Sequence, residues 1–190
     1  KENPNIEEEA KDLLRKWEEG DQEIMEIWKK LDSWVQKGFD ETYNELGIEF
    51  DVLYKESEIY DKGKDIVIKA YEKGIFIKED GAIIADLEDK KLGKKVLLRG
   101  DGTALYMTQD IYLAIKKFED FSLDKSVYVV GSEQINHFKQ LFEILNKLGI
   151  DSEKCFHLSF GMVYLPEGKM KSREGTVVDA DNLIEEMKRL

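Results

Sequence analysis

Three cations gather in one short segment near the C-terminus, Gly168–Val178. Lys169, Lys171 and Arg173 alternate along it between two glycines, so the segment could close over a polyphosphate and neutralise the charge on a departing pyrophosphate. The segment also follows an apolar run that indicates a buried strand. Because lysine, glycine and glutamate are common in loops, an ordinary surface turn is the alternative.

A second group of polar residues, Leu105–Asp110, stands at the start of a predicted helix. Tyr106 and Asp110 are four residues apart and therefore lie on one helical face. A carboxylate there could accept a guanidinium group through two hydrogen bonds, which distinguishes arginine from lysine. The alternative is a helix cap followed by a surface acid.

The third group lies in Val127–Phe138, where an apolar strand runs into Gly131 and polar residues open the next helix. Open parallel sheets bind ligands at this end of their strands. Gln134 or Glu133 could contact a substrate amine or ribose, and His137 shares the helical face of Gln134. A capping motif followed by a buried histidine is the alternative.

Metal and thiol chemistry have little support in this sequence. The chain contains two histidines, His137 and His157, and one cysteine, Cys155. These residues are too few for a cysteine-rich zinc site, and they do not support a Cys–His catalytic pair. A lone cysteine also excludes an internal disulfide framework and fits a reducing compartment.

Two kinds of secondary-structure pattern divide the chain. Residues 1–93 are mostly helical, with a small β element, and we expect the aromatic residues of the first helices to form core. From residue 94, strands and helices alternate, which predicts a parallel sheet that forms the second half of a doubly wound, Rossmann-like α/β fold. The predicted helices are two within 6–46, separated by Gly20 and Asp21, then 59–73, 104–118, 134–148 and one from 181; the predicted strands are 75–77, 82–86, 96–98, 127–130 and 156–165, with a short extended run at 50–54.

Composition narrows the class of protein. The 190 residues are 42% hydrophobic and carry a net charge of −12, which argues against a surface built mainly to hold nucleic acid. The apolar runs are too short to span a membrane, so we expect a cytoplasmic protein without a membrane partner. A half sheet would leave an apolar edge exposed, so we expect the chain to self-associate through it.

Taken together, these segments resemble arginyl-tRNA synthetases. The segment Gly168–Val178 resembles the lysine-methionine-serine signature loop of class I aminoacyl-tRNA synthetases. Leu97–Thr103 with Tyr106–Asp110, Val127–Phe138 and Phe156–Val163 are similar to that family's strands and helices in the same order. The resemblance covers nearly the whole chain.

The resemblance implies activation of arginine by ATP with Mg²⁺, followed by transfer to tRNA through the complete enzyme. ATP is then a substrate, and we predict no metal site formed by the protein itself. The roles carried over are an arginine pocket at Tyr106, Asp110 and Gln134; an adenosine site at His137 and the backbone of Met162 and Val163; and phosphate contacts, with a catalytic role, from Lys169, Lys171, Ser172 and Arg173.

The sequence also departs from the family. The family's histidine-rich signature and its helical anticodon-binding domain are missing, and the first residue is not methionine. Lys171 stands where the family usually has serine, Glu174 where it usually has lysine, and Gln109 where it often has arginine. We therefore expect an excised part of the catalytic region, with 94–190 as the C-terminal half of its nucleotide-binding domain, inactive alone. The alternative is a naturally truncated relative that binds arginine or a protein partner without catalysis.

Overall fold

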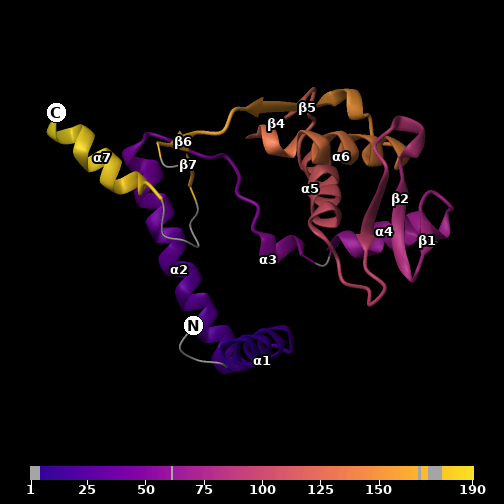
Figure 1. Cartoon of the computed structure of the whole chain (residues 1–190), viewed down its shortest axis with the longest axis horizontal. Coiled ribbons are helices and arrows are strands. Elements are labelled where there is room, and N and C mark those ends of the chain that lie inside the picture. The colour runs from indigo at the N-terminus through magenta and orange to yellow at the C-terminus, as the bar shows by residue number, and fades with distance from the viewer. Residues whose placement is uncertain (1–4, 61, 167, 171–176) are drawn as a thin grey trace. The chain divides into compact units, whose positions relative to one another are not determined.

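The structure of the chain is a computed structural model that describes residues 5–60, 62–166, 168–170 and 177–190 (Figure 1). The chain forms two compact units. One unit comprises Lys1–Asp51 and Met170–Leu190, and the other comprises Val52–Lys169. These units are defined by contacts in space and do not test the predicted domain boundary between residues 93 and 94. That boundary stays a prediction. Within the described residues, no helix combines the length and apolar character needed to cross a membrane.

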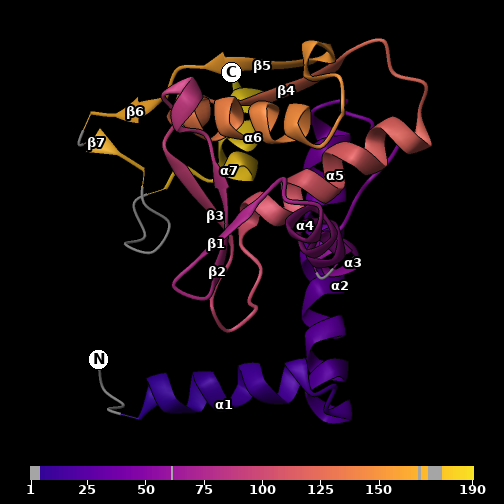
Figure 2. The ribbon, with the colours of Figure 1, turned by 90° about the vertical axis from the view of Figure 1, so that its right-hand side faces the viewer.

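An antiparallel sheet occupies the first half of the larger unit. Strands β1 (Ile77–Glu79), β2 (Ala82–Asp86) and β3 (Lys94–Leu98) lie in the order β1-β2-β3. A tight turn joins β1 to β2: Asp80 and Gly81 have φ angles of 47° and 82°, the left-handed backbone of a hairpin. Helices α3 (Glu56–Ile59), α4 (Lys62–Glu72) and α5 (Tyr106–Asp120) belong to the same unit, and α4 and α5 pack against the sheet (Figure 2).

One predicted pairing is wrong. The strand expected at 96–98 is present in β3, but it pairs antiparallel with β2 and not within the parallel sheet. Only the seven residues 87–93 connect β2 to β3. A parallel crossover needs a dozen or more residues, so the short connection allows only the antiparallel arrangement. The extended run expected at 50–54 does not form a strand.

The parallel sheet is confirmed and has two strands among the residues that the structure describes. β4 (Ser126–Gly131) and β5 (Cys155–Phe160) pair in parallel, and α6 (Ile135–Lys147) lies between them in the sequence. The strand predicted at 156–165 ends at Phe160. The chain then forms a separate hairpin of β6 (Tyr164–Leu165) and β7 (Gly168–Lys169).

The helices α4 and α5 approach closely at a glycine, and the same turn of α5 is hydrogen-bonded to β3. A β-carbon built on Gly63 of α4 would lie 2.2 Å from the carbonyl oxygen of Thr108 on α5. Thr108 is fully buried and donates from Oγ1 to the carbonyl oxygen of Leu97 on β3, at 2.6 Å. The core continues from this point through α5 and α6; its fully buried large side chains include Val67, Phe76, Leu87, Leu97, Met107, Ile111, Leu141, Ile144 and Leu145.

An aromatic cluster fills the space between β4 and α6. The ring centroid of Tyr128 lies 5.0 Å from that of Phe138 and 5.5 Å from that of Phe142. The Nζ atom of Lys117 lies 3.8 Å from the centroid of the Tyr128 ring. Burial raises the pKa of Tyr128 to about 12 and lowers the pKa of Lys117, because both charged forms lose water.

The described residues of the smaller unit form the helices α1 (Ile6–Glu18), α2 (Gln22–Glu45) and α7 (Ala180–Arg189). The predicted boundary between α1 and α2 is confirmed, because Gly20 has a φ of 76° and the side chain of Asp21 caps α2 by accepting from the N–H of Ile24. The rings of Trp17 and Trp28 pack edge to face, with 5.7 Å between their centroids.

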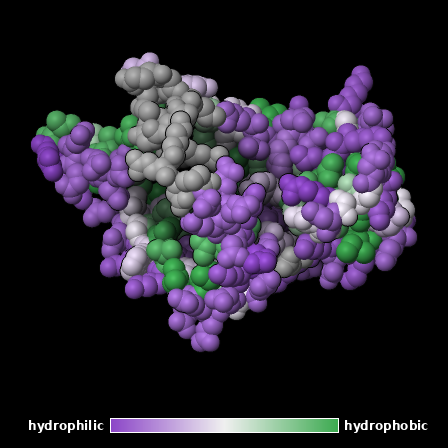
Figure 3. Space-filling view, turned by 60° about the horizontal axis from the view of Figure 1, so that its bottom comes forward, coloured by the Kyte–Doolittle hydropathy of each residue, from purple (hydrophilic) through white to green (hydrophobic). Residues whose placement is uncertain are grey.

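The expectation that the aromatic stripe of these helices is core is wrong for this chain. Neither α1 nor α2 has a buried residue, and Trp34 and Phe39 are 59% and 52% exposed. Amphipathic periodicity specifies an apolar face, but a second layer must cover that face before it becomes core. On the face of the molecule in Figure 3, hydrophobic residues form separate patches among hydrophilic ones.

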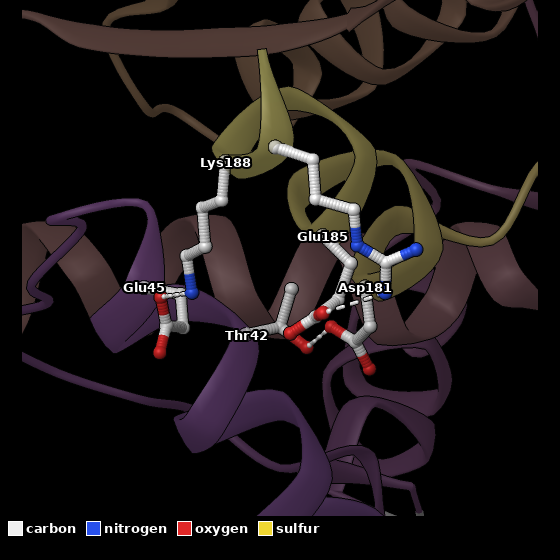
Figure 4. A network of polar contacts seen from close by, with 6 residues as sticks. Thr42, Glu45, Asp181, Glu185 and Lys188 are labelled. Carbon is white, nitrogen blue, oxygen red and sulfur yellow. Dashed lines mark hydrogen bonds and ion pairs between the residues drawn. The ribbon is translucent and has the colours of Figure 1, made fainter.

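Polar contacts hold α7 against α2 (Figure 4). Thr42 Oγ1 donates to Asp181 Oδ1 at 2.7 Å, and Lys188 Nζ lies 2.5 Å from Glu45 Oε2. The side chain of Asp179 caps α7 by accepting from the N–H groups of Asp181 and Asn182. These groups are exposed, so each contact stabilises the unit only slightly.

We predict that Gly63→Ala will destabilise the larger unit by more than about 2 kcal/mol, because its methyl group would overlap the backbone of Thr108. Urea unfolding followed by circular dichroism measures this change. Gly38→Ala is the matched control: Gly38 is also helical but has open space around it, so alanine should stabilise α2 by about 0.5 to 1 kcal/mol. A Gly63→Ala protein as stable as wild type would contradict the close approach.

A second prediction concerns pH. The pKa of Tyr128 is about 12 in the folded chain, against 10 in the unfolded chain. Stabilisation by neutral Tyr128 is therefore complete below pH 10, and it is lost as the pH rises from 10 towards 12. One pKa unit corresponds to about 1.4 kcal/mol; allowing for partial exposure, we expect the free energy of unfolding to fall by about 1 kcal/mol by about pH 11. Tyr128→Phe should remove this part of the fall, and equal pH dependence in both proteins would contradict the assignment.

Candidate functional site

The first polar residues of the candidate site lie where α5 begins. A tight loop precedes the helix: the Arg99 N–H donates to the Thr103 carbonyl at 3.0 Å, and the Thr103 N–H donates to Asp101 Oδ1 at 2.8 Å. Hydrogen bonding from Thr103 lowers the pKa of the Asp101 carboxyl group. Tyr106 is the first residue of α5 and is 75% exposed, and Asp110 follows one helical turn later. This loop presents Tyr106 to solvent.

Two of the predicted groups meet at Asp110 and His137. His137 Nε2 lies 2.6 Å from Asp110 Oδ2, with the side chains 20% and 37% exposed. The contact connects α5 to α6, which pack together. Because the Asp110 carboxylate can only accept hydrogen bonds, His137 Nε2 carries the donated proton. More than a third of the Asp110 side chain stays exposed to solvent.

Gln134 and Met162 lie around the C-terminal end of β4. Gln134 ends the 3-10 helix η2 (Ser132–Gln134), is exposed, and precedes His137 by three residues. A β-carbon built on Gly131 would lie 3.4 Å from Met162 Sδ, so Met162 covers the end of the strand. Val163, the next residue, is 71% exposed. Of the residues expected near adenosine, Met162 therefore lies at the C-terminal end of β4, and the adenosine site itself stays a prediction.

A hollow of about 230 Å³ opens beside Tyr106. It combines an acid, a guanidinium group, two phenol rings and a largely buried amide, contributed by α3, the loop after β3 and the first turns of α5. Its lining is Glu56, Tyr60, Arg99, Thr103, Ala104, Leu105, Tyr106 and Gln109.

The sequence did not identify Glu56, Tyr60 and Arg99 as parts of a site. Glu56 and Arg99 stand within segments that resemble the family, but neither residue belongs to a local spacing pattern. These residues come from two segments more than 35 positions apart, so only the fold brings them together. Gln109, noted as a departure from the family, is 8% exposed and lines the hollow.

The predicted phosphate-binding segment is described only in part. Lys169 lies in β7, the second strand of the β6–β7 hairpin. Lys171, Ser172 and Arg173 lie outside the described residues, as does Glu174. Among the residues that are described, no three histidine, cysteine or acidic side chains are grouped so that they could hold a metal ion.

Comparison with known proteins assigns the chain to a family. The family model described as "tRNA synthetases class I (R), catalytic domain" matches residues 1–189. The arginine–tRNA ligase of Treponema denticola is 56% identical over 187 residues, which cover 96% of this chain and 32% of the relative. The arginine–tRNA ligase of Bacteroides thetaiotaomicron is 54% identical, with 95% and 30% covered. The chain thus spans about a third of the length of these relatives.

Solved structures agree at the level of the fold. The arginyl-tRNA synthetase of Plasmodium falciparum superimposes with a TM-score of 0.70 at 21% identity, covering 96% of this chain and 33% of that one. The arginyl-tRNA synthetase of Thermus thermophilus gives a TM-score of 0.65 at 20% identity, with 94% and 38% covered. The match over residues 1–189, the shared fold and the order of the motifs show that this chain belongs to the catalytic-domain family of the class I tRNA synthetases for arginine.

Proposed function

We propose that this chain is the part of an arginine–tRNA ligase catalytic region that recognises the arginine side chain and contributes to ATP binding. The proposal is supported chiefly by the family match over residues 1–189 together with Asp110, whose side chain remains 37% exposed on the face of α5 that carries Tyr106. A guanidinium group presents paired N–H donors to such a carboxylate. Tyr106 and Gln134 would line the same pocket.

ATP with Mg²⁺ would be the second substrate. We expect adenosine near His137, Met162 and Val163, at the end of β4. Lys169, Lys171, Ser172 and Arg173 would contact the phosphates, and their cations would act most strongly as negative charge develops on pyrophosphate. In the complete enzyme, the arginyl group would then pass to tRNA.

The chain alone should bind substrate without completing the reaction. It spans about a third of the curated relatives and contains no histidine-rich signature turn. Electrostatic stabilisation of a transition state requires all the donors in fixed positions. We therefore expect substrate binding, and not turnover, to report on the function of this chain.

We predict that the chain binds arginine and not citrulline, which has the same shape but a neutral end group. Asp110→Asn keeps the size of the side chain and removes its charge, so it should weaken arginine binding at least about 30-fold. Isothermal titration calorimetry measures all three affinities, and circular dichroism checks that the variant is folded. Equal binding of arginine and citrulline by the wild-type chain would contradict guanidinium recognition by Asp110.

We also propose self-association through the β4–β5 sheet. The outward side chains of the two strands are all apolar, between 47% and 63% exposed and aligned by the parallel register: Val127, Val129, Phe156, Leu158 and Phe160. A second copy would offer the same apolar side chains, with Lys125 Nζ lying 4.9 Å from the centroid of the Phe156 ring, and such a surface suits a twofold contact. Since each copy carries a net charge of −12, salt should favour association.

Sedimentation velocity tests this contact. We predict that wild type will form dimers increasingly with concentration and salt, and that Val129→Lys with Leu158→Lys will stay monomeric because charges would be buried at the contact. Ile68→Lys is the matched control, since Ile68 is exposed on α4 and should not affect the dimer. A monomeric wild-type chain at all concentrations would contradict self-association.

A further inference from the structure

The contact between Asp110 and His137 gives the carboxylate a fixed hydrogen-bond donor. Oδ2 of Asp110 lies 2.6 Å from Nε2 of His137. A carboxylate offers about four lone-pair positions on its two oxygens. The imidazole occupies one of them on Oδ2. Oδ1 and the other lone pair of Oδ2 stay available, and a guanidinium group needs one position on each oxygen.

Both partners project from helical positions next to buried residues. Asp110 lies on α5 between Gln109, which is 8% exposed, and Ile111, which is fully buried. The ring of His137 meets the buried ring of Phe138 edge-on, with centroids 5.6 Å apart. The buried neighbours therefore fix the backbone from which each of the two side chains projects, and the hydrogen bond between them sets their orientation.

A second histidine supports this layer from the sheet. Phe138 packs against His157, with ring centroids 4.4 Å apart. Nε2 of His157 lies 2.9 Å from the carbonyl oxygen of Val130 on β4, and it donates to this oxygen because a carbonyl can only accept. A series of contacts therefore runs from the Asp110 carboxylate through the rings of His137, Phe138 and His157 to the carbonyl of Val130. This series links α5 to β4 through α6.

The chemistry of the donor is also suited to the ligand. The imidazole reaches the carboxylate through a single N–H and so takes up one lone-pair position of Oδ2. A lysine or arginine there would neutralise the carboxylate and compete with the guanidinium group. A carboxylate held in one orientation loses less conformational entropy on binding than a freely rotating one.

We propose that His137 is a positioning residue for arginine recognition, which orients the Asp110 carboxylate for the guanidinium group. The inference rests on the proposed function, because it names the residue that acts on the arginine side chain through Asp110. This role is separate from the predicted location of His137 near adenosine.

Arginine titration of two His137 variants tests the proposal. His137→Gln can place an amide N–H where Nε2 stands, so it should bind arginine within about 3-fold of wild type, whereas His137→Met fills the space without a donor and should bind about 10-fold more weakly. Citrulline binding should stay below detection in all three proteins. Equal affinity of the Met variant and wild type, or equal losses in the Gln and Met variants, would overturn the role of the donor.

Histidine NMR supplies a readout that needs no arginine. With two histidines in the chain, the imidazole N–H signals of His137 and His157 can both be followed. We expect the His137 Nε2–H proton to be visible because its hydrogen bond slows exchange with water, and to disappear in Asp110→Ala. The His157 signal should remain in that variant, since its acceptor is the carbonyl of Val130.

Arginine titration and histidine NMR together distinguish a failure of the proposed function from a failure of the inference about His137. A wild-type chain that shows the His137 signal, with its dependence on Asp110, but binds no arginine would overturn the proposed function and leave the Asp110–His137 pair in place. A His137 signal unchanged in Asp110→Ala would overturn the inference whatever the arginine result.

Discussion

The hydrogen bond from Thr108 Oγ1 to the carbonyl oxygen of Leu97 anchors the N-terminal part of α5 to β3. Both groups are buried, so breaking the bond would leave polar atoms without water. The same residue presents its backbone to Gly63, which lets α4 approach α5 closely. Tyr106 and Asp110 stand two positions before and after Thr108. Their placement at the candidate site therefore follows from how this one turn is buried.

The candidate site joins two structural parts of the larger unit. Its acidic residue lies on α5, which packs against the antiparallel sheet, and its histidine lies on α6, which follows the first strand of the parallel sheet. The aromatic layer of Phe138, His157 and Tyr128 fills the space beneath. Relative positions of Asp110 and His137 thus depend on the core between the two helices. A change in that core would move the carboxylate relative to its donor.

The smaller unit depends more on local helix signals and less on buried packing than the larger unit does. Its helices have strong local signals, with the Asp21 and Asp179 caps and an acidic first turn in α1. Large apolar side chains nevertheless remain exposed on α2, and the contacts between α2 and α7 include exposed polar pairs. Surface pairs contribute little to stability. The α1–α2–α7 unit should therefore be less stable than the unit with the buried core.

Sequence alone determined the local elements, because periodicity, capping residues and turn residues act within a few positions. The helices and the parallel pair of strands followed from such patterns, and the family followed from the resemblance of the ordered motifs. The tertiary structure decided what distant segments do to one another. It paired β3 with β2, left the stripe of α2 exposed, joined Asp110 to His137 and brought Glu56 and Arg99 to one hollow. These outcomes depend on loop length, on which layers cover an apolar face and on side-chain contacts between helices, and none of these has a periodic signal in the chain.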